Sequence, residues 1–260
     1  KYFSCTKALK ISLNEVTAER NGIKIIIRPN IIVGADGPLS AVGKYMGSLN
    51  SHFIVGINYK YCKDNSTLSF DFSRKTKVLF MPEIKGGYAW FFPGRKFVNC
   101  GLGIDFTLIN QKFKKYGFLK NLYLKMFDKF TIILSNENRE IKNQNFSNNL
   151  LKTVSGLIPV SGIMQKPVYE NIILVGDAAG LCHPITGAGI YNAVKSSKIA
   201  AKYILKTFLR KDILVLSQIK KEYNDYFESS LSRALKKRMF ISKNYNNINI
   251  KTSRITKIEQ

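Results

Sequence analysis

Asp177 is the residue in this chain best placed to contact a ligand, because residues with almost no side chain surround it. It follows an apolar run, Ile172 to Val175, whose leucine and β-branched residues predict a buried strand of an α/β sheet. Small side chains around a carboxylate allow another molecule to approach the carboxylate and the backbone together. The small residues are Gly176, Ala178, Ala179 and Gly180.

A second group of small residues follows, where the chain passes from loop to helix. Its members are Pro184, Gly187, Ala188, Gly189 and Ile190. Helical spacing of apolar residues begins at Ile190 and continues to Arg210. The free N–H groups at a helix start carry roughly half a unit of positive charge, which stabilises an anion or an electron-rich ring. Close packing without a ligand also uses Gly-x-Gly turns, but the order strand, Gly-Asp, Pro, Gly-x-Gly and helix favours a ligand site.

Another acidic turn lies near the start of the chain. Apolar runs at 23–28 and 31–33 predict strands, and Asp36-Gly37 follows the second run. Ser40 can cap a short helix over 42–46. Together with the later Gly-Asp turn, this pattern indicates the end of a nucleotide-binding domain.

Residues 51–150 have a different character. Their aromatic and β-branched runs alternate with turn residues, which predicts an antiparallel sheet. The runs are 52–61, 67–72, 78–81, 88–93 and 97–105. Alternation places Tyr88, Trp90 and Phe92 on one face of a strand, where they form either a core face or a flat apolar wall for an extended ligand.

Helical patterns occupy much of the remaining chain. Apolar residues have helical spacing at 108–130 and 219–240, and Lys211-Asp212 separates the latter from the helix at 190–210. Lysines between the aromatic residues of 108–130 suit core packing or a membrane-surface helix, of which core packing is the commoner. Residues 143–149 are a polar loop, and the polar end from 244 onward has no strong core pattern.

Composition narrows the classes of function. The 260 residues carry a formal net charge of +24, but the basic residues form no single stripe, so nucleic acid is disfavoured and anionic lipid head groups stay open as a partner. Four scattered cysteines without a CxxC pair indicate neither a zinc site nor a disulfide framework. No run reaches the ~18 apolar residues of a membrane helix, so we expect a cytoplasmic location, with peripheral membrane contact as a further option.

These motifs resemble those of a known family. GDAAGLCHPITGAGI is similar to the second flavin-contacting motif of FAD-dependent oxidoreductases of the hydroxylase-like superfamily, and within it to the geranylgeranyl reductase branch. VGADGPLSAVGKYMG resembles the DGxxSxVR motif, with Gly43-Lys44 where relatives carry an arginine. KGGYAWFFP resembles PxxYxWxFP, with Lys85 in place of the first proline.

The resemblance implies FAD as cofactor. Asp177 would bond the ribityl chain, Gly189 and Ile190 would lie beside the flavin ring, and the Asp36 turn would support the pyrophosphate region. The expected cofactor-binding residues are Gly176, Asp177, Ala178, Ala179, Gly180, Pro184, Gly187, Ala188, Gly189, Ile190, Asp36 and Gly37. The expected substrate-binding residues are Tyr88, Trp90, Phe92 and Pro93, while no catalytic residue and no metal ligand is assigned.

The resemblance further implies an α/β (α+β) architecture. We expect a partial FAD-binding Rossmann-like domain (1–50 and 151–210), interleaved with an antiparallel-sheet substrate domain (51–150) and followed by a helical C-terminal segment (211–260). GxGxxG does not occur in the sequence, so we expect the C-terminal part of a longer protein, which alone binds FAD poorly.

The implied activity is reduction of C=C bonds in an isoprenoid or prenyl lipid, with reduced nicotinamide or ferredoxin as electron donor. One alternative is an FAD-dependent monooxygenase or halogenase. Another is a flavin-less remnant or a basic binding protein.

Overall fold

The structure is a computed structural model that describes residues 2–62, 76–81, 84–106 and 150–244. The chain divides into two compact units, Lys1–His52 with Ile158–Arg238 (unit 1) and Phe53–Leu157 with Met239–Gln260 (unit 2). Several predicted segments fall outside the described residues. They are the strand at 67–72, the helix at 108–130, the loop at 143–149 and the polar end beyond 244.

A small parallel sheet lies at the centre of unit 1. Strands β4 (Ile32–Gly34) and β11 (Ile172–Leu174) pair in parallel, and β10 (Val168–Tyr169) pairs antiparallel with β11. All three residues of β11 are fully buried, as the continuous apolar run predicts for a strand covered on both faces.

A three-stranded antiparallel sheet precedes β4, consisting of β1 (Thr6–Ile11), β2 (Val16–Arg20) and β3 (Ile23–Ile27). Asn21 and Gly22 connect β2 to β3 with positive φ angles of 52° and 79°. Asn-Gly favours this turn because both residues tolerate the left-handed conformation. The strand predicted at 23–28 is confirmed, whereas β1 and β2 were not predicted.

The helices of unit 1 follow the predicted signals closely. Ser40 caps α1 (Ala41–Tyr45) by accepting a hydrogen bond from the Gly43 N–H at 2.7 Å. Helix α3 (Ile190–Arg210) has the predicted bounds and ends where Lys211 adopts a φ of 53°. The helix predicted at 219–240 is divided by a π-helical turn. Its parts are α4 (Gln218–Tyr223), the π-helical segment η7 (Asn224–Glu228) and α5 (Ser229–Asn244), of which unit 1 includes the residues up to Arg238.

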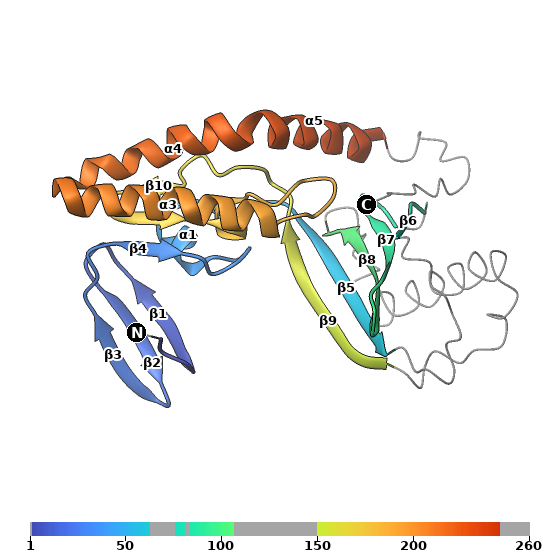
Figure 1. Cartoon of the computed structure of the whole chain (residues 1–260), viewed down its shortest axis with the longest axis horizontal. Helices are drawn as coiled ribbons and strands as arrows, with labels where there is room; N and C mark the ends of the chain where they lie inside the picture. The colour runs from blue at the N-terminus through green and yellow to red at the C-terminus, as the bar shows by residue number, and fades with distance from the viewer. Residues whose placement is uncertain (1, 63–75, 82–83, 107–149, 245–260) are drawn as a thin grey trace, which may run out of the picture. The chain divides into compact units, whose positions relative to one another are not determined.

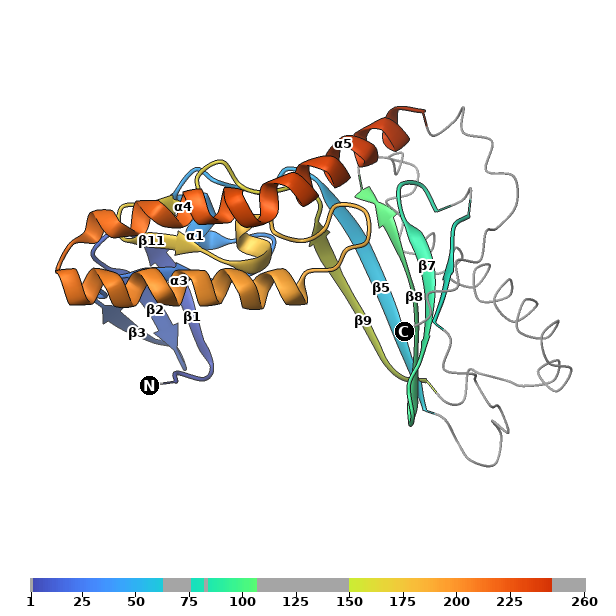
Figure 2. The same ribbon diagram turned by 45° about the horizontal axis from the view of Figure 1, so that its top comes forward.

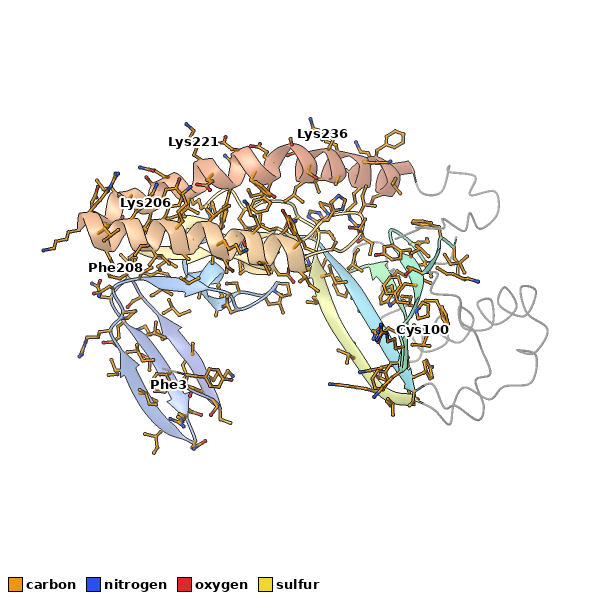
Figure 3. The ribbon with its side chains drawn as sticks, in the orientation of Figure 1. Phe3, Cys100, Lys206, Phe208, Lys221 and Lys236 are labelled. Atoms are coloured by element: carbon orange, nitrogen blue, oxygen red, sulfur yellow. The ribbon has the colours of Figure 1, made fainter. Side chains whose placement is uncertain are left out.

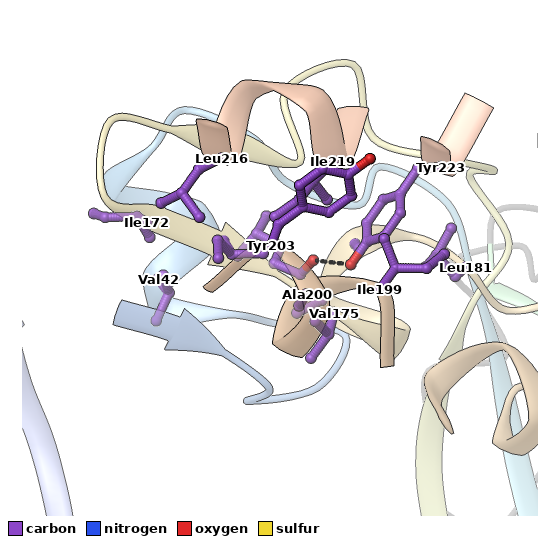
Figure 4. Close-up of a cluster of buried hydrophobic side chains, with 14 of the residues drawn as sticks. Val42, Ile172, Val175, Leu181, Ile199, Ala200, Tyr203, Leu216, Ile219 and Tyr223 are labelled. Atoms are coloured by element: carbon purple, nitrogen blue, oxygen red, sulfur yellow. Dashed lines mark hydrogen bonds between the residues drawn. The ribbon is translucent and has the colours of Figure 1, made fainter. Parts of the chain in front are cut away.

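Two short 3-10 helices complete unit 1, η5 (Gly176–Ala179) after β11 and η6 (Ile213–Ser217) between α3 and α4. Helices α3 and α4 lie side by side along the sheet (Figure 1, Figure 2). Their buried faces join β11 in one apolar cluster (Figure 4). The fully buried Tyr223 hydroxyl lies 3.1 Å from the Leu174 carbonyl oxygen and 3.2 Å from that of Ser196, and so ties α4 to the strand and to α3.

Unit 2 contains the predicted antiparallel sheet. Its strands are ordered β6-β7-β8-β5-β9, and β6, β7, β8 and β5 pair antiparallel. The bounds are β5 (Phe53–Cys62), β6 (Lys77–Leu79), β7 (Tyr88–Pro93), β8 (Phe97–Asp105) and β9 (Leu150–Pro159). Strand β9 was not predicted, and its mostly exposed side chains give it no alternating apolar pattern. Among the described helices, none is long and apolar enough to span a bilayer.

Candidate functional site

A pocket with a volume of about 420 Å³ lies in unit 1 where β11 ends and α3 begins. Six of the predicted cofactor-binding residues line it: Gly37, Gly176, Asp177, Gly187, Gly189 and Ile190. The two segments that the sequence singled out therefore meet at one cavity. Ile158 and Cys182 also line the pocket, although neither was among the predicted cofactor-binding residues.

The Asp177 side chain is the carboxylate of this pocket. It is half-buried, and burial raises its pKa. No described residue donates a hydrogen bond to the carboxylate, while the backbone carbonyl of Asp177 accepts one from Asn50 Nδ2 at 2.9 Å. Asp177 is thus fixed through its backbone and keeps its carboxylate available to a ligand.

Glycines keep the pocket open beside this carboxylate. A Cβ at Gly189 would lie 3.0 Å from Asp177 Oδ1, and Gly187 has a positive φ of 69°. Helix α3 begins directly after Gly189, which supplies no side-chain cap. The first N–H groups of a helix have no partner within it, so the positive end of α3 lies at the pocket.

His183 shapes the loop between η5 and α3. Its Nδ1 accepts hydrogen bonds from the backbone N–H groups of Ile185 (3.3 Å) and Thr186 (3.2 Å), which fixes the neutral tautomer with its proton on Nε2. The His183 carbonyl accepts a further bond from the Gly187 N–H at 2.9 Å. Burial lowers the pKa of His183, because the charged ring is disfavoured where it is desolvated.

Two residues that the sequence did not single out hold the pocket loops. Arg238 of α5 is buried and donates from Nη1 to the Pro184 carbonyl at 2.9 Å. Asn50 bridges the two acidic turns, since its Nδ2 also donates to the Pro38 carbonyl at 3.1 Å. Pro184 lies 54 residues from Arg238 along the chain. Pro38 and Asp177 lie 12 and 127 residues from Asn50, so no local sequence pattern indicates these contacts.

The other predicted cofactor-binding residues do not line the pocket. Ala178 and Ala179 are buried in the core cluster, and a Cβ at Gly180 would come within 2.2 Å of the Gly162 carbonyl oxygen. The Asp36 carboxylate accepts hydrogen bonds from Ser40 Oγ (2.5 Å) and from the backbone of α1, and Pro184 provides the carbonyl that Arg238 contacts. Ala188 lies in the loop, where its carbonyl accepts from the His183 N–H at 2.9 Å.

In unit 2 the aromatic side chains of β7 form a row. The ring centroids of Tyr88 and Trp90 are 5.9 Å apart, and those of Trp90 and Phe92 are 6.2 Å apart. Trp90 Nε1 donates to Asn58 Oδ1 at 3.0 Å. Ala89 and Phe91, on the other face of β7, are buried, whereas Phe92 is exposed and Trp90 is half-buried. The aromatic row is therefore not the buried face of this strand. Pro93 closes the strand and is half-buried.

Comparisons with solved structures show which fold the chain has. A crystal structure of a geranylgeranyl bacteriochlorophyll reductase-like protein from Thermoplasma acidophilum matches with a TM-score of 0.71 and 24% identity, covering 95% of this chain and 62% of that one. A probable FAD-dependent monooxygenase from Pseudomonas aeruginosa matches with a TM-score of 0.58 and 16% identity, covering 93% and 64%. The chain therefore has the mixed α/β fold of FAD-dependent oxidoreductases, as predicted.

The proteins related in sequence have names that specify an activity more narrowly than those of the solved structures. Digeranylgeranylglycerophospholipid reductase 3 from Methanosphaera stadtmanae is 30% identical over 221 residues, which is 81% of this chain and 48% of the relative. The digeranylgeranylglycerophospholipid reductase from Methanocella arvoryzae is 29% identical over 242 residues, 88% of this chain and 54% of the relative. These matches confirm the resemblance to geranylgeranyl reductases, and the chain spans about half the length of the curated relatives that it matches. No family model matches the chain.

Proposed function

We propose that this chain provides the flavin-ring end of an FAD site and the prenyl-binding sheet of an enzyme that reduces C=C bonds in a prenyl lipid. The observation that carries the proposal is the pocket at which the Asp177 carboxylate, the glycines of two loops and the start of α3 meet. The relatives named digeranylgeranylglycerophospholipid reductase support a prenyl lipid as the substrate class.

The residues of the pocket fit FAD. The Asp177 carboxylate is an available acceptor for a ribityl hydroxyl, and Gly187 and Gly189 leave room for a ring against the backbone. The positive end of α3 stabilises negative charge at the edge of such a ring. When bound, FAD supplies the hydride for C=C reduction.

The aromatic face of β7 fits a prenyl chain. Tyr88, Trp90 and Phe92 present an apolar surface, and the hydrogen bond to Asn58 fixes the plane of the Trp90 indole. An apolar wall excludes water from a reacting double bond. Reduced nicotinamide or ferredoxin is proposed as the electron donor. With a net charge of +24, the protein is proposed to be cytoplasmic with contact to anionic lipid surfaces.

Titration of the full 260-residue chain with FAD tests the cofactor site. Bound flavin is followed by its absorbance and by quenching of its fluorescence. We expect Asp177→Asn to weaken FAD binding roughly 10- to 100-fold, because a hydrogen bond to a charged group contributes about 1.5–3 kcal/mol. Asp225→Asn, an exposed carboxylate on η7, is the matched control and leaves the affinity unchanged. Equal affinities for the two variants would refute the site.

The reaction is tested separately with a prenyl lipid, the reduced donor and flavin. Mass spectrometry detects C=C reduction, because each reduced bond adds two hydrogens. Monooxygenases share the fold, and flavin-dependent brominase Bmp2 matches with a TM-score of 0.60 at 14% identity. Oxygen consumption coupled to substrate oxidation, without gain of hydrogen by the lipid, would replace the reductase proposal with that alternative.

A further inference from the structure

A second pocket of unit 1, with a volume of about 400 Å³, lies between the loop at 161–165 and the helical segment that runs from α4 through η7 into α5. It is named here the η7 pocket, and it shares no residue with the pocket that contains Asp177. The residues that line its helical side are Lys220, Asn224, Glu228, Ser232 and Leu235. It is therefore a separate cavity with a polar helical side.

The π-helical turn brings the helical residues of this pocket into line. In an uninterrupted α-helix, each step of four residues advances about 40° around the axis, so positions 220, 224, 228 and 232 would spread over about 120°. A π-helical turn has i→i+5 hydrogen bonds and rotates less per residue, so η7 brings Glu228 back toward the line of Lys220. The same turn keeps Tyr223 and Phe227 on the buried face. Because such turns are rare and occur frequently at functional sites, polar side chains aligned by one indicate a ligand site.

The polar side chains that line the η7 pocket have no partner in the described part of the chain. They are Gln165, Lys220, Asn224, Glu228 and Ser232. None of the five makes a side-chain hydrogen bond or an ion pair with another described residue. By contrast, Lys202 and Glu222 at the contact of α3 with α4 pair at 2.7 Å. The charges of Lys220 and Glu228 are therefore available to a ligand.

The loop side of the pocket is held from behind. The Met164 N–H donates to the Ala179 carbonyl at 3.0 Å, and Ser161 Oγ accepts from two backbone N–H groups at 2.8 and 3.0 Å. Gly162 has a positive φ of 80°, and a Cβ there would lie 3.1 Å from Leu235 Cδ2. Because these contacts already fix the loop, a ligand would bind without the cost of ordering it.

We propose that the η7 pocket binds a small zwitterion, with its anionic group at Lys220 and its ammonium group at Glu228. These two residues are eight positions apart, about 12 Å along the helix axis, so a short chain must separate the two charges of the ligand. Asn224, Ser232 and Gln165 can form hydrogen bonds with that chain. A phosphorylated amino alcohol has this order of groups, because a two-carbon chain joins its phosphate to its ammonium group. The same chemistry occurs in a free phosphoester and in a lipid head group.

Calorimetric titration of the full 260-residue chain with O-phosphoethanolamine, without flavin, tests the proposal. We expect Lys220→Gln and Glu228→Gln each to weaken binding roughly tenfold, because each removes a hydrogen bond to a charged group. Lys221→Gln and Asp225→Asn are the matched controls, since they remove the same charges at exposed neighbours that do not line the pocket. Figure 3 shows Lys221 pointing outward from α4. Both controls should change the affinity less than about twofold.

The two halves of the probe test recognition at both ends. Inorganic phosphate and ethanolamine should each bind at least roughly tenfold more weakly than the whole molecule, because each satisfies one end of the pocket. Sedimentation with vesicles of phosphatidylethanolamine distinguishes the sources. Vesicle binding that the two pocket variants weaken supports the proposal with a lipid head group as ligand, and binding of the free compound alone supports it with a free phosphoester.

The proposal is overturned if neither O-phosphoethanolamine nor the vesicles bind at concentrations up to about 10 mM. It is also overturned if pocket and control variants bind alike, or if inorganic phosphate binds as tightly as the whole probe. Thermal unfolding of each variant shows that these substitutions leave the chain folded. FAD titration of the same variants should give unchanged affinities, so failure of this proposal is distinguishable from failure of the proposed function.

Discussion

Units 1 and 2 both place glycines at their proposed ligand surfaces, but the space above those glycines differs. At the unit 1 pocket, the nearest atom to a Cβ at Gly187 would be 3.7 Å away, and at Gly189 only the Asp177 carboxylate is as close as 3.0 Å. In unit 2, a Cβ at Gly101 would lie 2.3 Å from Trp90 Cζ2 and 2.4 Å from the Ile57 carbonyl oxygen.

The difference shows that glycine has two different roles at these surfaces. Gly189 leaves a space that a ligand can enter and has an ordinary φ, so a larger residue there is expected to affect binding. Gly101 lies under an indole ring that already fills the space, so a larger residue there is expected to affect folding. Four experiments test this difference and the contacts at the two surfaces.

Gly101→Ala has the largest expected effect on stability. The new methyl group overlaps both the Trp90 ring and backbone that cannot move independently, and overpacking of this kind costs about 3 kcal/mol. Urea unfolding measures the loss as a lower midpoint. Gly156→Ala is the control, because nothing lies within 4 Å of its Cβ position and its stability should change by less than about 0.5 kcal/mol. Equal midpoints would show that the Trp90 ring does not depend on Gly101.

Gly189→Ala tests the pocket side of the comparison. Its φ of −124° suits any residue, and the methyl group would press against Asp177 Oδ1 instead of against the core. We expect the urea midpoint to stay close to that of the unchanged chain while FAD affinity falls roughly tenfold, equivalent to about 1.4 kcal/mol. A loss of stability like that of Gly101→Ala would contradict the assignment of Gly189 to a ligand space.

Trp90→Phe tests what fixes the aromatic row. The substitution keeps a ring but removes the N–H donor to Asn58, which should cost about 1 kcal/mol of unfolding free energy. A double-mutant cycle with Asn58→Ala isolates the pair. If the two losses are additive, the hydrogen bond does not orient the indole and packing over Gly101 alone does so.

The pH dependence of unfolding should show the smallest effect. Because burial lowers the pKa of His183, the unfolded chain binds more protons than the folded chain as pH falls through the ordinary histidine value near 6.5. The free energy of unfolding is therefore highest above that pH and declines below it. Asp177, whose pKa is raised, contributes the opposite slope at lower pH, above the ordinary aspartate value.

Thermal melts between pH 7.5 and 5 measure the decline. In His183→Gln the dependence should be shallower, because a glutamine does not titrate and can still accept from the Thr186 N–H. An unchanged slope in His183→Gln would exclude His183 as its source.

Local patterns predicted much of the fold. Strands β7 and β8 and helix α3 have the bounds that alternation or helical spacing indicated, and the Ser40 cap formed as expected. Strands β1, β2 and β9 were missed because their exposed side chains carry little apolar alternation, and pairing with neighbouring strands defines them instead. Whether Asp36 and Pro184 contact a cofactor remains a prediction, and both also hold neighbouring loops.

By itself, the sequence determined that a strand, an acidic turn and a helix start succeed one another around Asp177, because residue type and period act within a few positions. Only the tertiary structure decided that Gly37 meets Gly189 at one pocket, that Arg238 and Asn50 hold its loops, and that Trp90 covers Gly101. These contacts join residues far apart in the chain. They arise from packing and from the need to pair buried polar groups, and neither leaves a periodic signal in the sequence.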